Sequence, residues 1–316
     1  MSAYEISLLS VIGINVILAV SLNMISGFCG QISLGHGAFY GAGAYAAALA
    51  MIGTGNILLA LISAIVVGSL LGIVVGFASL RVRSDFLAVT TIGVNFLFTG
   101  FVRKQGWLGG EMGISGIPGS GLGADGNMVM ILLFAAATIA LSLYIGRSWM
   151  GFAFRAVGED EDTAATLGIN AAAYKLAAFG IGTALAGLAG GLYTFFTQFI
   201  TADAFDFILS VMLMAMVVIG GIGSTWGVVV AAIGLTLLPE AIRFVNDYRL
   251  LVFGGLLVLV IRLAPGGFAA LARAVATRLS RACPPRSNSR TSPFVSAVYT
   301  LWTASHFSWV RAISSA

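Results

Sequence analysis

Four polar side chains, Asn23, Gln31, Ser33 and His36, interrupt an apolar, glycine-rich stretch with the sequence SLNMISGFCGQISLGHGAFYGAGAY. Amides, a hydroxyl and a neutral imidazole can donate and accept hydrogen bonds to a small zwitterionic solute. The same groups can instead form hydrogen bonds between helices, each contributing about 1 kcal/mol in a membrane. Both interpretations stay open from the residues alone. Asn95, in a later apolar segment, is a further candidate for the lining of a solute pathway.

Sequence motifs for catalysis and metal binding are absent. The only lysines, Lys104 and Lys175, do not follow a Gly-x4-Gly pattern, so the chain has no P-loop for ATP. His36 and His306 are too far apart for a zinc motif built on histidines, and no G-x-S-x-G nucleophile elbow occurs. The two cysteines predict neither a disulfide framework nor a metal site. We therefore expect no enzymatic activity, no metal and no cofactor.

The segment RSWMGFAFRAVGEDEDTAATLGIN, residues 147–170, is the main polar feature of the chain. Its four consecutive acids, residues 159–162, are a third of the 12 acidic residues in the protein. Several alanines favour a helix, and the sequence Gly-Ile-Asn at its end is typical of a helix stop. A solvated turn is the simpler alternative, but the segment is long for a turn. We predict a short helix outside the membrane that offers a docking surface to a soluble protein.

The composition indicates the elements that must position these groups. Only 9% of the residues are charged and the mean hydropathy is +1.01, whereas roughly a quarter of the residues of soluble domains are charged. Apolar runs long enough to cross the ~30 Å hydrocarbon core recur along the chain. We therefore predict an all-α, polytopic transmembrane bundle of eight or nine spans. The second span is short and rich in Gly and Ala, which makes it a candidate for a re-entrant or broken helix. The expected spans are 6–25, 36–52, 57–80, 86–103, 128–146, 172–196, 207–222, 226–242 and 248–263.

Charge predicts the topology and the domain organisation. Residues 262–316 contain seven arginines and no acid, which suits an anionic membrane surface and gives little support to nucleic-acid binding. The distribution of arginines places this tail and the acidic segment in the cytoplasm. The loop 105–127, with nine glycines, then lies outside and is expected to be neither helix nor strand. We divide the chain into a transmembrane domain, 1–267, and a basic tail of disordered composition, 268–316.

Glycines at four-residue spacing predict close helix packing, because small residues let helix backbones approach each other in lipid. Two glycine-rich stretches, 27–37 and 220–227, are also candidates for unwound backbone that faces a pathway. The spaced glycines are Gly37 and Gly41, Gly68, Gly72 and Gly76, Gly187 and Gly191, and Gly223 and Gly227.

Three motifs, in order along the chain, resemble permeases of branched-chain amino acid ABC transporters of the LivM type. The first is the polar stretch SLNMISGFCGQISLGHGAFYGAGAY, and the second is LGGEMGISGIP, which is similar to an external loop of that family. The third is the acidic segment, followed by YKLAAFGIGTALAGLAGGLY. The similarity extends from about residue 10 to residue 267.

The resemblance implies a multi-pass permease of a bacterial inner membrane, embedded in the lipid bilayer, that carries leucine, isoleucine or valine. Such a subunit pairs with a second permease subunit, two ATP-binding subunits and a periplasmic solute-binding protein. Gly158 stands where the family often has arginine, which would weaken a contact with the ATPase. The residues that the resemblance and the acidic segment assign to ATPase coupling are Arg155, Glu159, Asp160, Glu161, Asp162, Gly168 and Ile169.

Two alternatives remain. An importer of urea or short amides would use the same machine for another cargo. A self-sufficient channel or facilitator belongs to a different class, and the acidic segment argues against it because a channel does not need to present a helix to a motor. The scarcity of charges within the spans favours a neutral or zwitterionic solute in each case.

Overall fold

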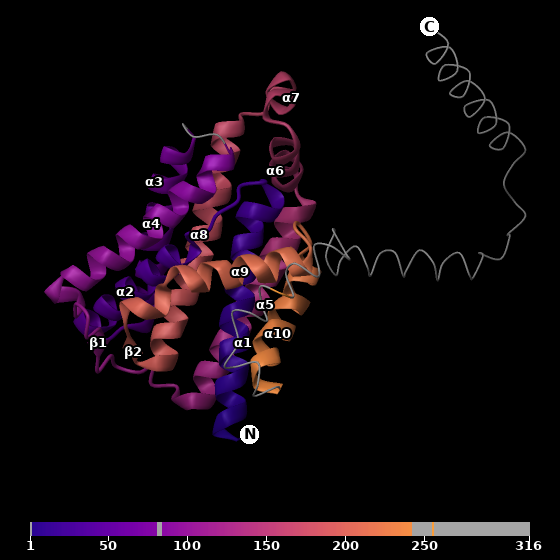
Figure 1. The fold of residues 1–316 in the computed structure, drawn as a ribbon. Coiled ribbons are helices and arrows are strands. Elements are labelled where there is room, and N and C mark those ends of the chain that lie inside the picture. The colour runs from indigo at the N-terminus through magenta and orange to yellow at the C-terminus, as the bar shows by residue number, and fades with distance from the viewer. Residues whose placement is uncertain (1, 81–83, 242–254, 256–316) are drawn as a thin grey trace, which may run out of the picture. The chain divides into compact units, whose positions relative to one another are not determined.

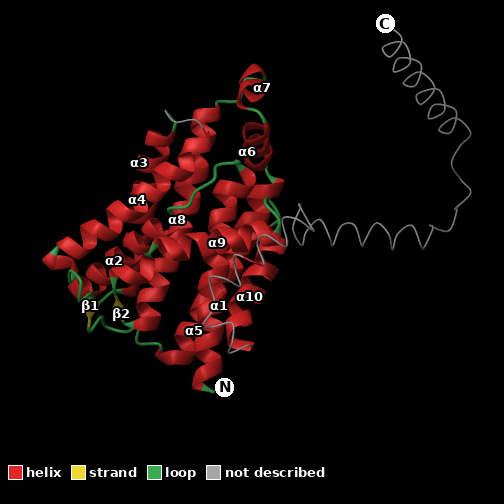
Figure 2. Cartoon of the chain, viewed as in Figure 1, coloured by secondary structure: helices red, strands yellow, loops and turns green. Residues whose placement is uncertain are grey.

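The computed structural model describes residues 2–80, 84–241 and 255, and these residues are almost entirely helical (Figures 1 and 2). The predicted ninth span and the predicted basic tail lie outside the described residues. The elements are α1 (Ala3–Leu22), the π-helix η1 (Asn23–Phe28), α2 (His36–Thr54), α3 (Ile57–Ser79), α4 (Ser84–Lys104), the 3-10 helix η2 (Gly106–Leu108), β1 (Ile114–Ser115), α5 (Gly123–Arg147), α6 (Trp149–Glu159), α7 (Glu161–Thr166), α8 (Ala171–Thr197), β2 (Phe199–Ile200), the 3-10 helix η3 (Ala202–Phe205), α9 (Phe207–Gly220) and α10 (Thr225–Ala241).

Six of these helical segments are long and apolar enough to cross a membrane, which confirms the all-α, multi-span fold class. A shorter apolar helix covers Thr225–Leu238. The second predicted span corresponds to α2, a continuous helix of 19 residues, so the glycine-rich interruption precedes this helix and does not divide it. The six segments are Ala3–Phe28, Ile57–Ala78, Phe86–Lys104, Gly123–Arg147, Ala171–Thr197 and Ala202–Gly220.

Glycines bring α2, α3 and α8 into close contact. A Cβ atom at Gly68 of α3 would lie 3.0 Å from the Cα of Gly187 in α8, and a Cβ at Gly190 would lie 2.6 Å from the amide nitrogen of Ala44 in α2. A Cβ at Gly43 would lie 2.7 Å from the carbonyl carbon of Gly187. We call this region the glycine interface. It confirms that the spaced glycines of α3 and α8 serve close helix packing in lipid.

The buried apolar side chains form two clusters. The larger one joins α1, α2, α3, α8, α9 and α10. The smaller one lies where η1 meets α6, α7 and α8, and we call it the inner cluster. The inner cluster contains Met24, Phe28, Cys29, Ile145, Phe154, Val157, Ala164 and Ala178.

The prediction that the loop 105–127 contains neither strand nor helix is wrong in three places, the first of which is the 3-10 helix η2. Ile114 and Ser115 form β1, which pairs antiparallel with β2 so that Ile114 lies opposite Ile200. The first turns of α5 also belong to this range, because that helix begins at Gly123. The pairing partner of β1 is distant in sequence, and a local glycine count cannot reveal it. β1 and β2 lie at one end of the helices, and α6 and α7 lie at the other (Figure 1).

Candidate functional site

The chain leaves helical geometry between α1 and α2. The π-helix η1 ends at Phe28, and residues 29–35, which we call the break, are irregular, with Gly30 at a φ of +69°. The backbone amide of Gln31 donates to the backbone carbonyl of Ile25, at 3.2 Å, so the chain turns back toward α1. This return places His36 beside Ser21, with 2.7 Å between His36 Nε2 and Ser21 Oγ. Local π-helices of this kind often occur at functional sites.

A second interruption contacts the first. Residues 221–224 separate α9 from α10, and Gly223 there has a φ of +80°. Its amide donates to Asn23 Oδ1 at 2.9 Å, and a Cβ on Gly27 would lie 2.6 Å from the same amide nitrogen. Two glycine-rich stretches about 200 residues apart, each predicted to be unwound, therefore meet at one place.

The four polar side chains singled out in the sequence are all buried, and they lie in η1, in the break and at the start of α2. Asn23, Ser33 and His36 are 0% exposed and Gln31 is 2% exposed. One polar atom of each has no hydrogen-bond partner: Asn23 Nδ2, Gln31 Oε1, Ser33 Oγ and His36 Nδ1. A buried polar atom without a partner costs about 1–3 kcal/mol. Four such atoms within one short stretch indicate a site where a polar ligand can supply the missing bonds.

Asn95 has a different environment from these four residues. It is buried in α4, and its Nδ2 donates to Ser210 Oγ at 3.0 Å and to the carbonyl of Asp206 at 3.4 Å. The same Ser210 hydroxyl accepts from the amide of Gly37 at 2.9 Å. Asn95 therefore connects α4 to α9 and to the first turn of α2, and its amide group already has partners.

Two residues of the site were missed by the sequence analysis. Ser21 orients His36 and stands two residues before Asn23, so its place in the same motif was a usable signal. Ser210 lies in α9, far from the motif in sequence, and nothing near it distinguishes it from other serines in apolar helices.

The acidic segment forms two helices, α6 and α7, and the prediction of a single helix is wrong. The helix is interrupted at Asp160, whose φ of −157° and ψ of 113° are extended. Its carboxylate accepts from the amides of Asp162, at 2.9 Å, and Thr163, at 3.1 Å, and so caps the N-terminus of α7. The hydrogen bond from the backbone of Thr163 is the main cause that lowers the pKa of Asp160.

Several of the predicted coupling residues shape this segment. Arg155 donates from Nη2 to the carbonyl of Gly146, at 2.7 Å, and so holds α6 against the end of α5. Glu161 pairs with Lys175 in the first turn of α8. Gly168, at a φ of +79°, ends α7, and the amide of Ile169 donates to the carbonyl of Ala164 at 3.1 Å. These contacts fix the position of α6 relative to α5 and of α7 relative to α8.

The exposed residues of the segment include two acids and three large apolar side chains, whereas Phe154, Val157 and Ala164 are buried in the inner cluster. Within the described part of the chain, the carboxylates of Glu159 and Asp162 have no ion-pair partner. Large apolar side chains are exposed beside them: Trp149 at 77%, Phe152 at 58% and Leu167 at 73%. Aromatic residues are enriched at protein interfaces. We call these five residues the coupling surface.

The acidic segment contacts the break directly, at Gly158. A Cβ atom on Gly30 would lie 3.0 Å from the carbonyl oxygen of Gly158, and a Cβ on Gly158 would lie 3.0 Å from the carbonyl carbon of Cys29. The expectation from the sequence was that Gly158, in place of an arginine, weakens a contact with the ATPase. The structure places this position against the backbone of the break, where a side chain has little room.

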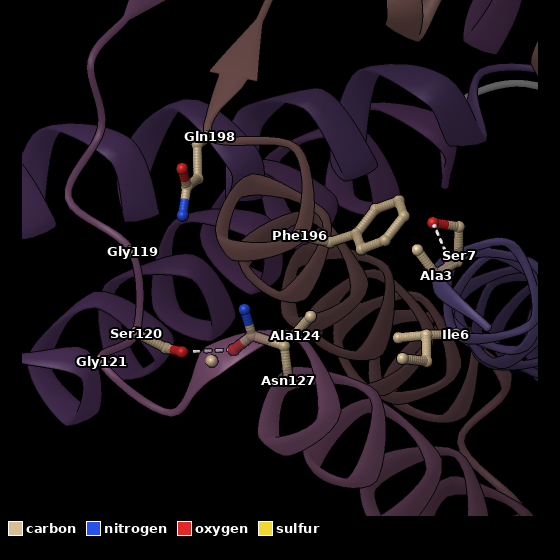
Figure 3. A pocket seen from close by; sticks show the side chains of 11 residues that line it. Ala3, Ile6, Ser7, Gly119, Ser120, Gly121, Ala124, Asn127, Phe196 and Gln198 are labelled. Carbon is tan, nitrogen blue, oxygen red and sulfur yellow. Dashed lines mark hydrogen bonds between the residues drawn. The ribbon is translucent and has the colours of Figure 1, made fainter. Parts of the chain in front are cut away.

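A cavity of about 620 Å³ lies at the end of the helices opposite to α6 and α7. Its walls are the start of α1, the loop around Gly119 and Gly121, the start of α5 and the end of α8 (Figure 3). The Ser120 hydroxyl bonds to Asn127, and Gln198 lies above Gly119. The lining contains neutral residues only, and none of the predicted pathway residues is among them.

Comparison with known proteins identifies the family of this chain. The model of a family described as the permease component of branched-chain amino acid transport systems matches residues 5–261. The chain belongs to this family of permeases. Such permeases are transport components, and the long apolar helices agree with a multi-pass protein of the inner membrane.

Individual relatives agree with the family. The chain is 32% identical to the high-affinity branched-chain amino acid transport system permease protein LivM of Salmonella typhimurium, over 82% of this chain and 68% of the relative. It is also 32% identical to LivM of Escherichia coli, with the same coverage. Its identity to LivH of Escherichia coli is 29%, over 79% of this chain and 89% of the relative. No solved structure gives a significant match.

Proposed function

We propose that this permease is a membrane-spanning subunit of an ABC importer that moves leucine, isoleucine or valine across the inner membrane. Its relatives LivM and LivH are named as permeases of branched-chain amino acid transport systems. The observation that carries the proposal is the group of four unpartnered polar atoms on buried side chains between Asn23 and His36, of which Asn23 also contacts the second interruption.

The chemistry of this site suits a zwitterion. Asn23, Gln31, Ser33 and His36 offer donors and acceptors without a fixed charge. A charged side chain at this depth would be costly and would bind a solute of opposite charge too strongly to release it. A net-neutral amino acid needs only hydrogen bonds that replace part of its hydration.

The coupling surface supports a second part of the proposal, in which energy comes from separate subunits. Trp149, Phe152 and Leu167 offer an apolar contact to an ATP-binding subunit, and Glu159 and Asp162 flank it with charge. Arg155 anchors α6 to α5, and Gly158 contacts the break. Movement of the docked ATPase would therefore reach the polar site through the backbone contact at Gly158 and through the inner cluster, in which η1 packs against α6. The complete importer would contain a second permease subunit, two ATP-binding subunits and a periplasmic solute-binding protein.

Uptake by the reconstituted importer tests the cargo. The chain is placed in proteoliposomes with its partner permease, ATP-binding subunits and solute-binding protein, and uptake of labelled leucine and urea is measured with and without ATP. We expect ATP-dependent leucine uptake and no urea uptake. Urea uptake without leucine uptake would overturn the cargo, and leucine flux through the chain without ATP-binding subunits would indicate a channel.

Charge reversal tests the coupling surface. The double variant Glu159→Lys with Asp162→Lys changes the two acids that have no ion-pair partner in the described residues, and leaves the pair between Glu161 and Lys175 intact. We expect it to insert normally but to lose ATP-driven uptake. Glu111→Lys, an exposed acid in the loop at the other end of the helices, is the matched control. Normal uptake by the double variant would remove the docking role of these acids.

A further inference from the structure

The hydrogen bonds around Ser21 determine which nitrogen of His36 carries the proton. The Ser21 hydroxyl has one proton, and it donates this proton to the carbonyl of Leu18 at 2.7 Å. Its oxygen must therefore accept in the 2.7 Å contact with His36 Nε2, so Nε2 is protonated. Within the described residues no carboxylate bonds to the ring, and burial of an unpaired charge is costly, so the imidazole is neutral. His36 Nδ1 is then a bare acceptor.

The orientation of Asn23 is determined in the same way. Its Oδ1 accepts from the amide of Gly223 at 2.9 Å, which leaves Nδ2 with its donors unused. Gln31 Oε1 is an unused acceptor. The site thus divides by polarity: the acceptors His36 Nδ1 and Gln31 Oε1 belong to the start of α2 and to the break, and the donor Asn23 Nδ2 belongs to η1, on the side chain whose Oδ1 contacts the second interruption.

We propose, on the basis of the proposed function, that His36 Nδ1 and Gln31 Oε1 accept hydrogen bonds from the α-ammonium group of the solute, and that Asn23 Nδ2 donates to its α-carboxylate. An ammonium group has three donors and no acceptor, so it matches two bare acceptors. The site selects α-amino acids by their backbone groups. Urea, which has no ammonium, and carboxylic acids that lack the amino group would leave the acceptors unpaired.

Two substitutions of His36 separate this role from packing. Glutamine places its amide near the position of Nε2 and keeps a donor for Ser21, but has no acceptor at the position of Nδ1. Asparagine places its amide near Nδ1 and restores an acceptor there, but loses the bond to Ser21. A packing role predicts that glutamine is tolerated better, because glutamine keeps the hydrogen bond to Ser21 and asparagine loses it.

The experiment measures ATP-driven leucine uptake by the complete importer with saturating, leucine-loaded binding protein. We expect His36→Gln and Gln31→Leu to lower the uptake rate about tenfold or more, because hydrogen bonds to charged groups contribute about 1.5–3 kcal/mol and 1.4 kcal/mol is a factor of ten. His36→Asn should regain part of the rate. Thr194→Val, a buried polar change away from the break, is the control. Wild-type uptake by His36→Gln would overturn the assignment.

A spectroscopic measurement covers the case in which a variant fails to fold. The chain has two histidines, His36 and His306, so selective ¹⁵N-histidine labelling of this subunit within the unlabelled wild-type complex gives two rings, and His306→Gln assigns them. We expect leucine to shift the Nδ1 resonance of His36 and 4-methylpentanoate, which lacks the ammonium, to leave it unchanged. No shift with leucine would overturn the ammonium assignment. Absence of leucine uptake in the wild-type complex would instead reject the proposed function.

Discussion

The glycine interface and the break are both buried and rich in glycine and small polar residues, yet their polar groups are treated differently. In the interface, Thr183 Oγ1 donates to the carbonyl of Phe179 at 2.7 Å, and Thr194 Oγ1 donates to the carbonyl of Ala44 at 3.1 Å. In the break and just after it, Ser33 Oγ and His36 Nδ1 have no partner. These two hydroxyls of the interface have hydrogen-bond partners, and the two polar atoms at the break do not.

The difference follows from the backbone. In a helix, the hydroxyl of serine or threonine can bond to a carbonyl three or four residues earlier, so a buried hydroxyl is satisfied locally. Where the chain leaves helical geometry, this acceptor is lost. Irregular backbone at membrane depth is tolerated only where it is buried in protein or lines a cavity. In the function proposed above, the unpartnered atoms of the break serve a solute, whereas the bonded hydroxyls of the glycine interface serve packing.

The largest expected effect comes from filling the glycine interface. Gly187→Leu would push side-chain atoms into the backbones of α2 and α3, since a Cβ at this position would already lie 3.2 Å from the Cα of Gly68. Overpacking of this kind costs about 3 kcal/mol. We expect loss of the folded subunit, measured as the yield of monodisperse protein in detergent.

The control is Gly93→Ala in α4, because a Cβ at Gly93 meets nothing within 4 Å. It should fold at least as well as the wild type, since glycine inside a helix is less favourable than alanine by about 0.5–1 kcal/mol. A normal yield for Gly187→Leu would show that the interface is loose, and the contrast with the break would then disappear.

A smaller effect, on transport and not on folding, is expected at the contact between α6 and the break. In Gly158→Ala the new methyl group would lie 3.0 Å from the carbonyl carbon of Cys29, so α6 or the break must shift by a few tenths of an ångström. A change of about 1 kcal/mol in this contact corresponds to about fivefold. We expect the ratio of leucine transported to ATP hydrolysed to fall by about that factor, with a normal yield.

Gly53→Ala, where a Cβ meets nothing within 4 Å, is the matched control for this ratio. If Gly158→Ala leaves the ratio of leucine transported to ATP hydrolysed unchanged, the acidic segment acts on the site by another route.

Removal of single hydroxyl groups tests the comparison, because the stability should change in opposite directions at the interface and at the break. Thr194→Val removes a hydroxyl that has partners and should lower the stability by about 1 kcal/mol. Ser33→Ala removes a hydroxyl without a partner and should raise the stability of the solute-free protein by about 1 kcal/mol, because the desolvation cost is relieved. Thermal unfolding of the two purified variants measures the signs. Two shifts of the same sign would contradict the distinction between scaffold and site.

The smallest effect concerns pH and the cap of α7. Because hydrogen bonding lowers the pKa of Asp160 in the folded state, the cap stabilises α7 above the unfolded pKa and is lost as the pH falls through the lower, folded pKa. Below about pH 4, where a free aspartate starts to protonate, α7 should begin to fray. Hydrogen exchange of the amides of Asp162 and Thr163 measures this, and Asp160→Asn, which still caps a helix but does not titrate, should remove the pH dependence.

Much of the fold could be predicted because its signals are local. Apolar runs predicted the membrane helices, and eight of the nine expected spans correspond to helices in the described residues. The spacing of Gly68, Gly72 and Gly76 predicted close packing, and all three pack against α8. The polar motif predicted Asn23, Gln31, Ser33 and His36 as a group, although their role in the pathway remains a proposal.

Other features could not be predicted because they depend on distant partners. The strand β1 exists because Ile114 meets Ile200. The division of the acidic segment into two helices has a local cause instead, the cap that Asp160 provides to α7, and the sequence analysis missed it. Asn95 was grouped with the pathway residues, and the structure shows its amide bonded to Ser210. Arg155 was assigned to the ATPase, and the structure bonds it to Gly146.

The sequence by itself determined that this protein lies in a membrane, which residues are its polar groups and where its helices are interrupted, because hydropathy, charge and glycine content act locally. Only the tertiary structure decided which buried polar atoms have hydrogen-bond partners. Ser33 and Thr194 are both small hydroxyl residues in apolar surroundings, and no property of the residue tells them apart. Thr194 lies in a helix and bonds to the carbonyls of Gly190 and Ala44, whereas Ser33 lies in the irregular break and its hydroxyl has no partner, since a hydrogen bond requires two groups to meet in space.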